Sequence, residues 1–325
     1  MGRSFCMEGL MTIVDFEKIH IKEAQMLGLA NYNEEKANAA ALPDLEQFPD
    51  LEPFASNGLG VAAFEGERMI GYLCCYSPRN HAFGSLAKGV FSPIQAHGAV
   101  KENRGIIYQR MYQAAAQKWV ERNIAYHSIA LYAHDCQAQN AMFTYGFGRR
   151  CVDAVRVMES IPCRPSQGIV YAELSSGMSD KVRQLRLMLA EHMGKSPCFM
   201  CSVMNNFEQS LAEKEMGDNK IFVAEDAGKV IAFVEISDEA ETFAATETED
   251  MCNICSAFCL PEYRGRDIYQ NLLNYMINQM KNEGYNRLGV DYESFNPTSN
   301  AFWPKYFTEY THSVVRRIDE CAMHD

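Results

Sequence analysis

The chain has 325 residues, 47% of them hydrophobic and 22% charged, which is the composition of a folded globular protein and excludes a disordered or fibrous one. Its 42 acidic and 30 basic residues give a net charge of -12, which argues against nucleic acid and anionic membranes as partners. The sequence has no run of 18 apolar residues and no secretory signal at its start, so we expect a cytoplasmic protein with reduced cysteines.

The first half of the sequence alternates strands and helices. Residues 1–10 carry no pattern, and we expect a disordered leader before a folded chain that begins at Met11. Two strands are predicted on either side of a turn at Gly66, followed by a strand over residues 90–100. A helix comes next, then a strand over residues 126–134, a second helix and a closing strand over residues 149–158. Helical spacing places four apolar residues of the first helix on one face: Ile107, Met111, Ala115 and Trp119.

The second half repeats this pattern at a spacing near 160 residues. Ile107-Tyr108-Gln109 recurs as Ile268-Tyr269-Gln270, and NAMFTYGF from Asn140 aligns with NAFWPKYF from Asn300. Pro162, Pro165 and Gly168 punctuate the segment between the copies. We therefore predict two copies of one mixed α/β domain, over residues 11–163 and 164–325.

Each element of the first copy has a counterpart in the second. A helical segment over residues 181–193 precedes a hairpin that turns at residues 226–228, and a strand over 253–260 follows. The main helix of this copy has an apolar face made of Ile268, Leu272, Leu273, Met276 and Met280. A strand over 287–294, a short helix and a closing strand over 312–318 complete the copy.

The loop between the strand at 253–260 and the following helix reads PEYRGRDI, over residues 261–268. It resembles the pyrophosphate loop of the GNAT superfamily of acetyl-CoA-dependent N-acetyltransferases, whose motif is Gln/Arg-x-x-Gly-x-Gly/Ala. Arg264 takes the first position of the motif, whereas Asp267 and Tyr269 stand where small residues are usual. The resemblance implies two tandem GNAT-like domains, and we expect the Asp267 side chain to cap the helix.

In the first copy the corresponding loop, Lys101 to Tyr108, is one residue shorter and has Ile106 in place of Asp267. We therefore expect a degenerate first copy and an acetyl-CoA site in the second. The resemblance implies that strand, loop and helix residues, with an Asn after the next strand, hold the cofactor. These are Ala257, Phe258, Cys259, Arg264, Gly265, Arg266, Asp267, Ile268, Tyr269, Gln270 and Asn296. The strand residues would act through their backbone, at a gap that the family opens with a β-bulge.

The family usually places a Tyr seven residues after the Asn to protonate the leaving thiolate. That position holds Trp303 here and Phe143 in the first copy, so Tyr306 is our candidate for the acid; its alternative role is an aromatic core residue. For the general base we expect Glu293, which alternates with Tyr292 on a strand that also carries Asp291. The alternative for both carboxylates is a solvated position at the strand end.

These features predict an N-acetyltransferase that moves an acetyl group from acetyl-CoA to an amine of a small molecule by direct attack in a ternary complex. The alternative is a non-catalytic module that binds acyl-CoA or another ligand on a degenerate GNAT fold. We expect a monomer, in which the two copies form an intrachain pseudo-dimer, or a homodimer.

Three other features have open interpretations. The pairs Cys198/Cys201 and Cys252/Cys255 have the C-x-x-C spacing of a zinc or redox site. We expect no metal, because the second pair lies on a predicted strand, where residues three apart face opposite sides, and a zinc site needs a closed set of ligands. Residues 235–250 hold seven acids and no Lys or Arg, which either attract a cationic amine or form a solvated loop. In the first copy, strand ends carry a set of polar residues that serves either as a base or as a structural polar pair: His97, His134 and Asp135.

Overall fold

The computed structural model describes residues 11–175, 177–200, 219–238 and 248–323. The chain forms two compact units. Unit 1 comprises Met1–Ala40, Asp44–Arg150 and Tyr310–Asp325, and unit 2 comprises Ala41–Pro43 and Cys151–Glu309. Most of the strand predicted over residues 149–158, which closes the first copy, therefore belongs to unit 2. The strand predicted over residues 312–318, which closes the second copy, belongs to unit 1. The repeat boundary near residue 163 stays a prediction about the sequence.

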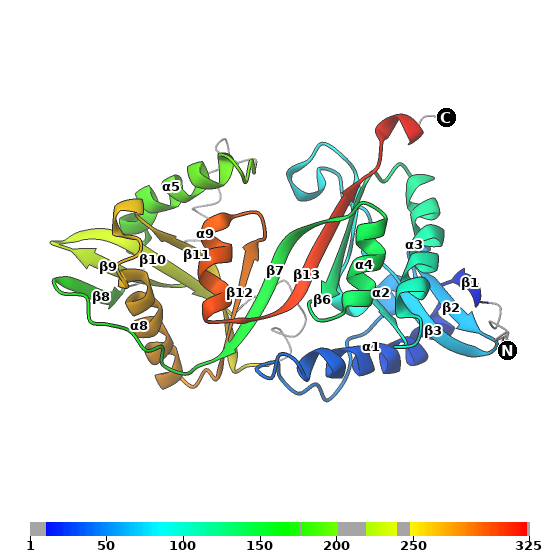
Figure 1. Ribbon diagram of the computed structural model, residues 1–325, viewed down its shortest axis with the longest axis horizontal. Helices are drawn as coiled ribbons and strands as arrows, with labels where there is room; N and C mark the ends of the chain where they lie inside the picture. Colours follow the sequence, from blue (N-terminus) through cyan, green and yellow to red (C-terminus); the bar gives the residue numbers. More distant parts are fainter. Residues whose placement is uncertain (1–10, 176, 201–218, 239–247, 324–325) are drawn as a thin grey trace, which may run out of the picture. The chain divides into compact units, whose positions relative to one another are not determined.

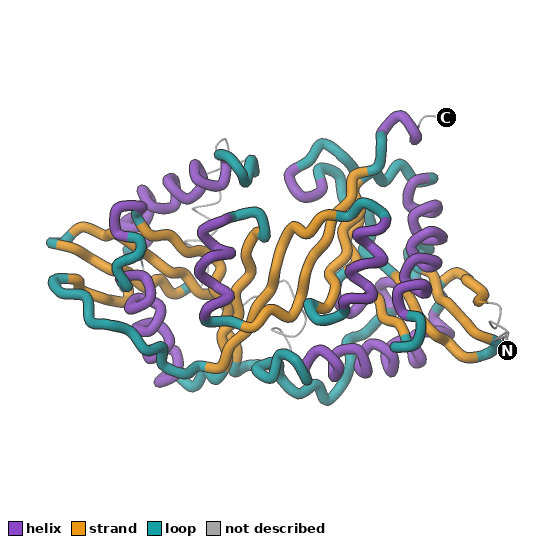
Figure 2. The backbone as a smooth tube through the Cα atoms, in the orientation of Figure 1, coloured by secondary structure: helices purple, strands orange, loops and turns teal. Residues whose placement is uncertain are grey.

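Unit 1 contains an antiparallel sheet and a second group of strands, flanked by helices (Figures 1 and 2). The antiparallel strands, in spatial order, are β1 (Met11–Asp15), β2 (Val61–Glu65), β3 (Arg68–Leu73) and β5 (His97–Ala99). The second group, also in spatial order, is β4 (Gly89–Ser92), β6 (Tyr126–Tyr132) and β13 (Thr308–Arg317). The helices are α1 (Ile21–Lys36), α2 (Glu52–Ala55), α3 (Arg104–Val120) and α4 (Cys136–Thr144).

Unit 2 is built on six strands. Their spatial order is β7 (Gly148–Val157), β12 (Arg287–Glu293), β11 (Met251–Cys259), β10 (Lys229–Ser237), β9 (Lys220–Asp226) and β8 (Ile169–Glu173). The helices are α5 (Arg183–Gly194), α8 (Ile268–Asn282) and α9 (Pro297–Phe302). Figure 1 shows α5 and α8 on different sides of strands β8 to β11. No helix in the described part of the chain is long and apolar enough to cross a membrane.

The predicted mixed α/β fold is confirmed. The predicted apolar faces of α3 and α8 are fully buried, and Leu272 and Met276 of α8 have no exposed surface. The hairpin of β9 and β10 turns at Ala227 and Gly228, which both have positive φ, as a two-residue turn that matches the strand twist requires.

The strand predicted over residues 90–100 is wrong in one respect, because the chain forms two short strands there, β4 and β5. Pro93 and a single 3-10 turn over Ile94–Ala96 separate them. Proline has no N–H to donate to a ladder, and β4 pairs with β6 whereas β5 pairs with β3. The interruption thus moves the chain from one strand partner to another.

Candidate functional site

The central feature of unit 2 is a gap between the parallel strands β11 and β12. The two strands pair only where Met251–Ile254 lies beside Arg287–Val290. Beyond that point β11 pairs with β10 alone and β12 pairs with β7 alone, so the facing edges separate. The register of β10 against β11 skips Cys255, which forms a β-bulge at the start of the gap. Backbone groups on the facing edges of both strands are therefore left without a strand partner.

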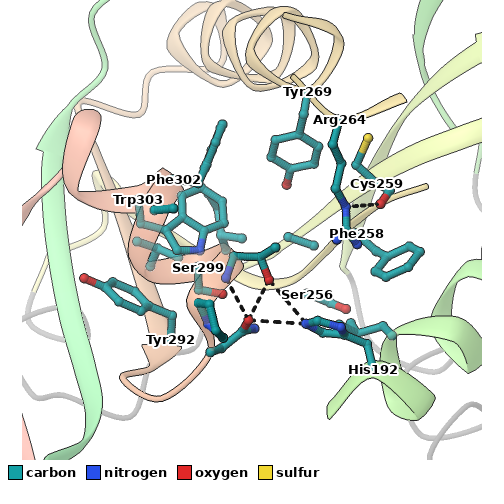
Figure 3. A pocket seen from close by; sticks show the side chains of 18 of the residues that line it. His192, Ser256, Phe258, Cys259, Arg264, Tyr269, Tyr292, Ser299, Phe302 and Trp303 are labelled. Atoms are coloured by element: carbon teal, nitrogen blue, oxygen red, sulfur yellow. Dashed lines mark hydrogen bonds between the residues drawn. The ribbon is translucent and has the colours of Figure 1, made fainter. Parts of the chain in front are cut away.

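A cavity of about 610 Å³ occupies this gap, within the range of small-molecule sites (Figure 3). Its walls come from α5, β11, the loop before α8, α8 itself, the end of β12 and α9. Of the thirteen residues predicted for the site, Arg266 alone does not line the cavity. The structure thus brings together residues that the sequence scatters over 50 positions.

The loop between β11 and α8 places the helix N-terminus at the cavity. The Nε of Arg264 donates a hydrogen bond of 2.9 Å to the carbonyl of Cys259, and its guanidinium lies 5.4 Å from the centre of the Phe258 ring. Gly265 and Asp267 both have positive φ, at 72° and 59°, and this tight turn starts α8 at Ile268. The first N–H groups of a helix have no intrahelical acceptor and favour anions.

Asp267 does not cap α8, contrary to our expectation. It occupies the N-cap position in the left-handed conformation, and its side chain makes no capping hydrogen bond. Its negative charge instead acts on a neighbour: the pKa of Tyr306 is raised, first by burial and then by Asp267 and Cys163. Arg266 does not line the cavity, and its guanidinium lies 5.9 Å from the ring centre of Tyr263, which does.

Tyr269, in the first turn of α8, is a wall residue with its hydroxyl directed into the cavity (Figure 3). Its ring packs edge-on against Phe302 at 5.2 Å and against Trp303 at 6.2 Å. The hydroxyl oxygen is buried and has no hydrogen-bond partner among the described residues. Burial raises the pKa of this phenol well above its usual value. The side chain is therefore a neutral donor held in an apolar wall.

Asn296 and His192 close the opposite wall. Asn296 is the N-cap residue of α9, and its Oδ1 accepts hydrogen bonds from the backbone N–H and the hydroxyl of Thr298. The same oxygen lies 3.3 Å from the Nε2 of His192. His192 comes from α5, and our sequence reasoning missed it. The spacing of Leu189, His192 and Met193 at i, i+3 and i+4 on one helix was the available signal.

The two predicted catalytic side chains also line the cavity. Glu293 ends β12, and its carboxylate contributes to a raised pKa of the Cys198 thiol, after burial. Tyr292 is buried, with its hydroxyl donating to Glu309 at 2.7 Å. Tyr306 also lines the cavity, and its ring lies 5.0 Å from the Phe302 ring.

Unit 1 fills the equivalent positions with its own side chains. At the offset that aligns Ile107 with Ile268, α3 begins three residues earlier than α8, so one turn of helix replaces the loop. Arg104 is buried there and contacts the carboxylates of Glu34 and Asp135 at 2.9 and 3.1 Å. This ion-pair cluster leaves the start of α3 without the open loop that precedes α8.

In unit 1 a side chain of β5 bonds to the backbone of β6. The Nε2 of His97 bonds to the carbonyl of Ala130 on β6, and its Nδ1 lies 2.7 Å from the hydroxyl of Tyr108. Tyr108 is the repeat counterpart of Tyr269. His134 bonds to the buried Glu35 at 2.7 Å, so His97 and His134 both have structural partners.

Two other sequence features are now placed. Cys252 is buried and Cys255 is exposed, and no group of three His, Cys, Asp or Glu side chains in the described ranges is arranged to hold a metal. Cys201 lies outside the described residues. The acidic stretch is not a single loop, because Glu235 lies in β10, is fully buried and bonds to Arg186 at 2.8 Å. Of the other acids, Glu239, Glu241 and Glu247 lie outside the described residues.

The fold and the cavity together define a class of protein: a mixed α/β protein with a ligand site where two parallel strands separate beside a helix N-terminus. Residues 193–307 match the model of the Acetyltransferase (GNAT) family. The chain thus carries a GNAT acetyltransferase domain.

Solved structures share this fold along nearly the whole chain. A GCN5-related N-acetyltransferase from Sphaerobacter thermophilus is 12% identical, with a TM-score of 0.57, over 94% of this chain and 95% of that one. A GCN5-related glucosamine N-acetyltransferase region of a fungal multi-domain GH3 β-N-acetylglucosaminidase is 11% identical, with a TM-score of 0.50, over 94% of this chain and 38% of that one. No curated protein sequence matches significantly. At this identity the likeness concerns the fold, and it extends over both units.

Proposed function

We propose that unit 2 is an N-acetyltransferase that moves an acetyl group from acetyl-CoA to an amine of a small molecule by direct attack in a ternary complex. The observation that carries the proposal is the cavity of about 610 Å³, which joins unpaired strand edges to the N-terminus of α8. A ligand with an anionic end and an amide-bearing arm matches both ends of such a site.

The residues present fit acetyl-CoA. The N–H groups of Ile268, Tyr269 and Gln270 at the start of α8, with the helix dipole, suit a pyrophosphate. Arg264 adds a positive charge beside them, and Asp267 opposes it with a carboxylate that makes no capping bond. The edges of Ala257–Cys259 that face away from β10 offer backbone donors and acceptors to the amides of the arm.

The side chains around the gap are suited to direct transfer. Glu293 is the carboxylate that we assign to accept the proton of the amine. Backbone N–H groups at the gap polarise the thioester carbonyl where negative charge develops. Cys259 is not a nucleophile in this scheme, because burial raises the pKa of its thiol to about 11 and keeps it protonated at neutral pH.

The acceptor amine would enter beside α5. Leu189 and Met193 give that wall an apolar surface, and His192 gives it a polar one. Such a mixed wall suits a small amine better than a polyanion, which the net charge of -12 also opposes. The first panel of amine probes consists of tyramine, spermidine and glucosamine. Glucosamine is included because one solved structure with this fold is described as a glucosamine N-acetyltransferase region.

A thermal-shift titration with acetyl-CoA tests the site. A ligand that binds only the folded chain stabilises it by RT ln(1 + [L]/Kd), or about 2.7 kcal/mol at 100 times Kd. We expect the wild type to shift and Arg264→Glu to lose the shift. Lys101→Glu makes the same charge change in the exposed loop of unit 1, and it should keep the shift. A shift lost only in Lys101→Glu would contradict the assignment to unit 2.

Release of free thiol in the presence of the amine panel tests transfer. We expect turnover by the wild type and a loss of about 100-fold or more in Glu293→Gln, because a positioned base contributes about 10² to 10⁴ in rate. A wild-type chain that binds acetyl-CoA but acetylates no amine would favour the alternative, a non-catalytic acyl-CoA-binding module.

A further inference from the structure

We propose that the segment joining the two sequence copies, residues 159–168, forms the outer edge of the cofactor site, where its Arg164 binds the 3′-phosphate of acetyl-CoA. This assignment rests on the proposed transferase function and names the part of the donor that unit 2 recognises outside the cavity. Three observations point to it. The joining segment is clamped to α8, the clamp ends at the loop before that helix, and the side chain of Arg164 pairs with no described residue.

One face of α8 holds the joining segment. Three polar side chains recur every four residues on this helix and therefore lie on one side of it: Gln270, Asn274 and Asn278. They bond to the carbonyl of Pro162, the backbone N–H of Ile161 and the hydroxyl of Ser160, over 2.6, 2.7 and 2.8 Å respectively. The joining segment thus runs along α8 from its last turns toward its N-terminus.

The clamp ends at the loop that starts α8. The Nδ2 of Asn271, in the first turn of the helix, donates to the carbonyl of Arg164 at 2.7 Å and to the carbonyl of Asp267 at 2.8 Å. It also lies 3.2 Å from the hydroxyl of Ser166. A single amide nitrogen therefore fixes the backbone of Arg164 beside the loop that we assign to the pyrophosphate.

The same place is a rim of the cavity. Asp267 and Lys305 are exposed and line the cavity, and Tyr306 lines it next to Lys305. After burial, the carboxylate of Asp267 is the next cause of a raised pKa at Tyr306 and at Cys163, which precedes Arg164 in the chain. The loop before α8, the turn after α9 and the joining segment consequently meet at this rim.

The positive charges at the rim are available to a ligand. Arg164 is exposed, and neither its side chain nor that of Lys305 makes an ion pair or hydrogen bond within the described ranges. Two cations thus accompany the single carboxylate of Asp267, in a chain whose net charge is -12. Such a local excess of positive charge attracts an anion, and a guanidinium binds phosphate oxygens through two parallel hydrogen bonds.

Acetyl-CoA carries a phosphate that suits this position. With its arm on the free edge of β11 and its pyrophosphate at the start of α8, the ribose lies outside the cavity, and its 3′-phosphate is the remaining anionic group. A phosphopantetheine arm attached to a protein lacks this phosphate. The contact therefore favours free coenzyme A thioesters over protein-bound ones as acyl donors.

The repeat supplies an internal comparison. At an offset of 161, the counterparts of Asn274 and Asn278 on α3 are Gln113 and Gln117. Gln113 donates to the hydroxyl of Tyr145, and Gln117 donates to a carboxylate of its own helix. These side chains of α3 are used within unit 1, so the clamp distinguishes unit 2 from the copy that we consider degenerate.

The test compares two ligands, acetyl-CoA and acetyl-3′-dephospho-CoA, by isothermal titration calorimetry. We expect the wild type to bind acetyl-CoA at least about tenfold more tightly, since hydrogen bonds to a charged group contribute at least this factor. Arg164→Ala should weaken acetyl-CoA by at least about tenfold and leave the dephospho ligand within about threefold. Lys281→Ala removes the same charge from the last turn of α8, and it should keep the preference.

Asn271→Ala tests the clamp, because Asn271 acts on the ligand only through Arg164 in this scheme. We expect it to reduce the preference for the 3′-phosphate at least about threefold while the affinity for the dephospho ligand stays within about threefold. A merely structural role would weaken both ligands alike, and that result would overturn the role of the clamp.

The other outcomes also decide the proposal. Equal affinity of the wild type for both ligands would overturn it, as would a preference retained in Arg164→Ala. Equal weakening of both ligands in Arg164→Ala, or a preference lost in Lys281→Ala, would assign the effect to overall charge and overturn it too. A preference lost in Lys305→Ala and kept in Arg164→Ala would place the phosphate at the turn after α9 instead.

Failure of the proposed function gives a different result. A wild-type chain that binds neither ligand would refute the cofactor site itself, and the role of Arg164 would fall with it. A chain that shows the expected preference but acetylates no amine would refute transfer alone and support the 3′-phosphate contact.

Discussion

The buried pair of Arg186 and Glu235 gives a quantitative test of the core beside the cavity. The two side chains are 5% and 0% exposed, and the guanidinium lies 2.8 Å from the carboxylate. At an effective dielectric constant of about 20, this separation corresponds to about 6 kcal/mol of attraction, which desolvation of both ions opposes. Arg186→Met leaves the carboxylate with a hydrogen bond of 3.0 Å from the amide of Asn219. We expect the free energy of unfolding to fall by about 3–5 kcal/mol.

The double replacement Arg186→Met with Glu235→Leu separates the value of the pair from the cost of breaking it. Two nitrogens of Arg186 have no partner among the described residues, so replacing both ions with apolar side chains removes orphaned donors as well. We expect the double variant to lie within about 1 kcal/mol of the wild type or above it, measured by urea unfolding with far-UV circular dichroism. A single variant that loses less than 1 kcal/mol, or a double variant that loses the sum of both singles, would refute this reasoning.

Two further predictions concern stability. Burial lowers the pKa of His97 and of His127 from 6.5 to about 4, so the unfolded chain binds more protons than the folded chain as the pH falls. Each neutral histidine therefore contributes roughly 3 kcal/mol to the free energy of unfolding above pH 6.5, and this contribution is lost between about pH 6.5 and 4. Urea midpoints at pH 7 and 4.5 measure this loss, and a slope that is unchanged in His127→Phe would contradict it. In Gly289→Ala the new Cβ would clash with Oδ1 of Asn253, so we expect the free energy of unfolding to fall by about 1–3 kcal/mol; an unchanged stability would show that Asn253 rotates freely.

Local patterns were sufficient for much of unit 2. The apolar face of α8 follows from helical spacing alone, and the turn at Ala227 and Gly228 follows from the residue types. The loop residues were predicted for the site because a phosphate-binding turn needs a helix start, a basic residue and a glycine close together in sequence, and the structure places Arg264 and Gly265 at the cavity.

Long-range partners were not predictable in the same way. The alternating pattern of β7 fits any neighbouring strand, and nothing in it shows that Leu288 of β12 lies opposite Arg156. Glu235 reads as part of an acidic surface, because its neutralising partner Arg186 is 49 residues away on another element. His192 was missed for the same reason, because it reaches the cavity from α5, far in sequence from the other polar residues of the lining.

The comparison of the two copies explains why one of them is open. In unit 1 two polar groups at the equivalent site have protein partners: Arg104 meets two carboxylates, and Tyr108 meets a histidine that also bonds to β6. These contacts are made when the chain folds, so they favour a closed structure. In unit 2 the strands separate, Asp267 makes no capping bond and Tyr269 has no acceptor among the described residues, each at a cost in free energy that the fold alone does not repay. Separated strand edges and an open helix start that meet at one cavity favour a ligand site, which is why we propose the chemistry for this copy.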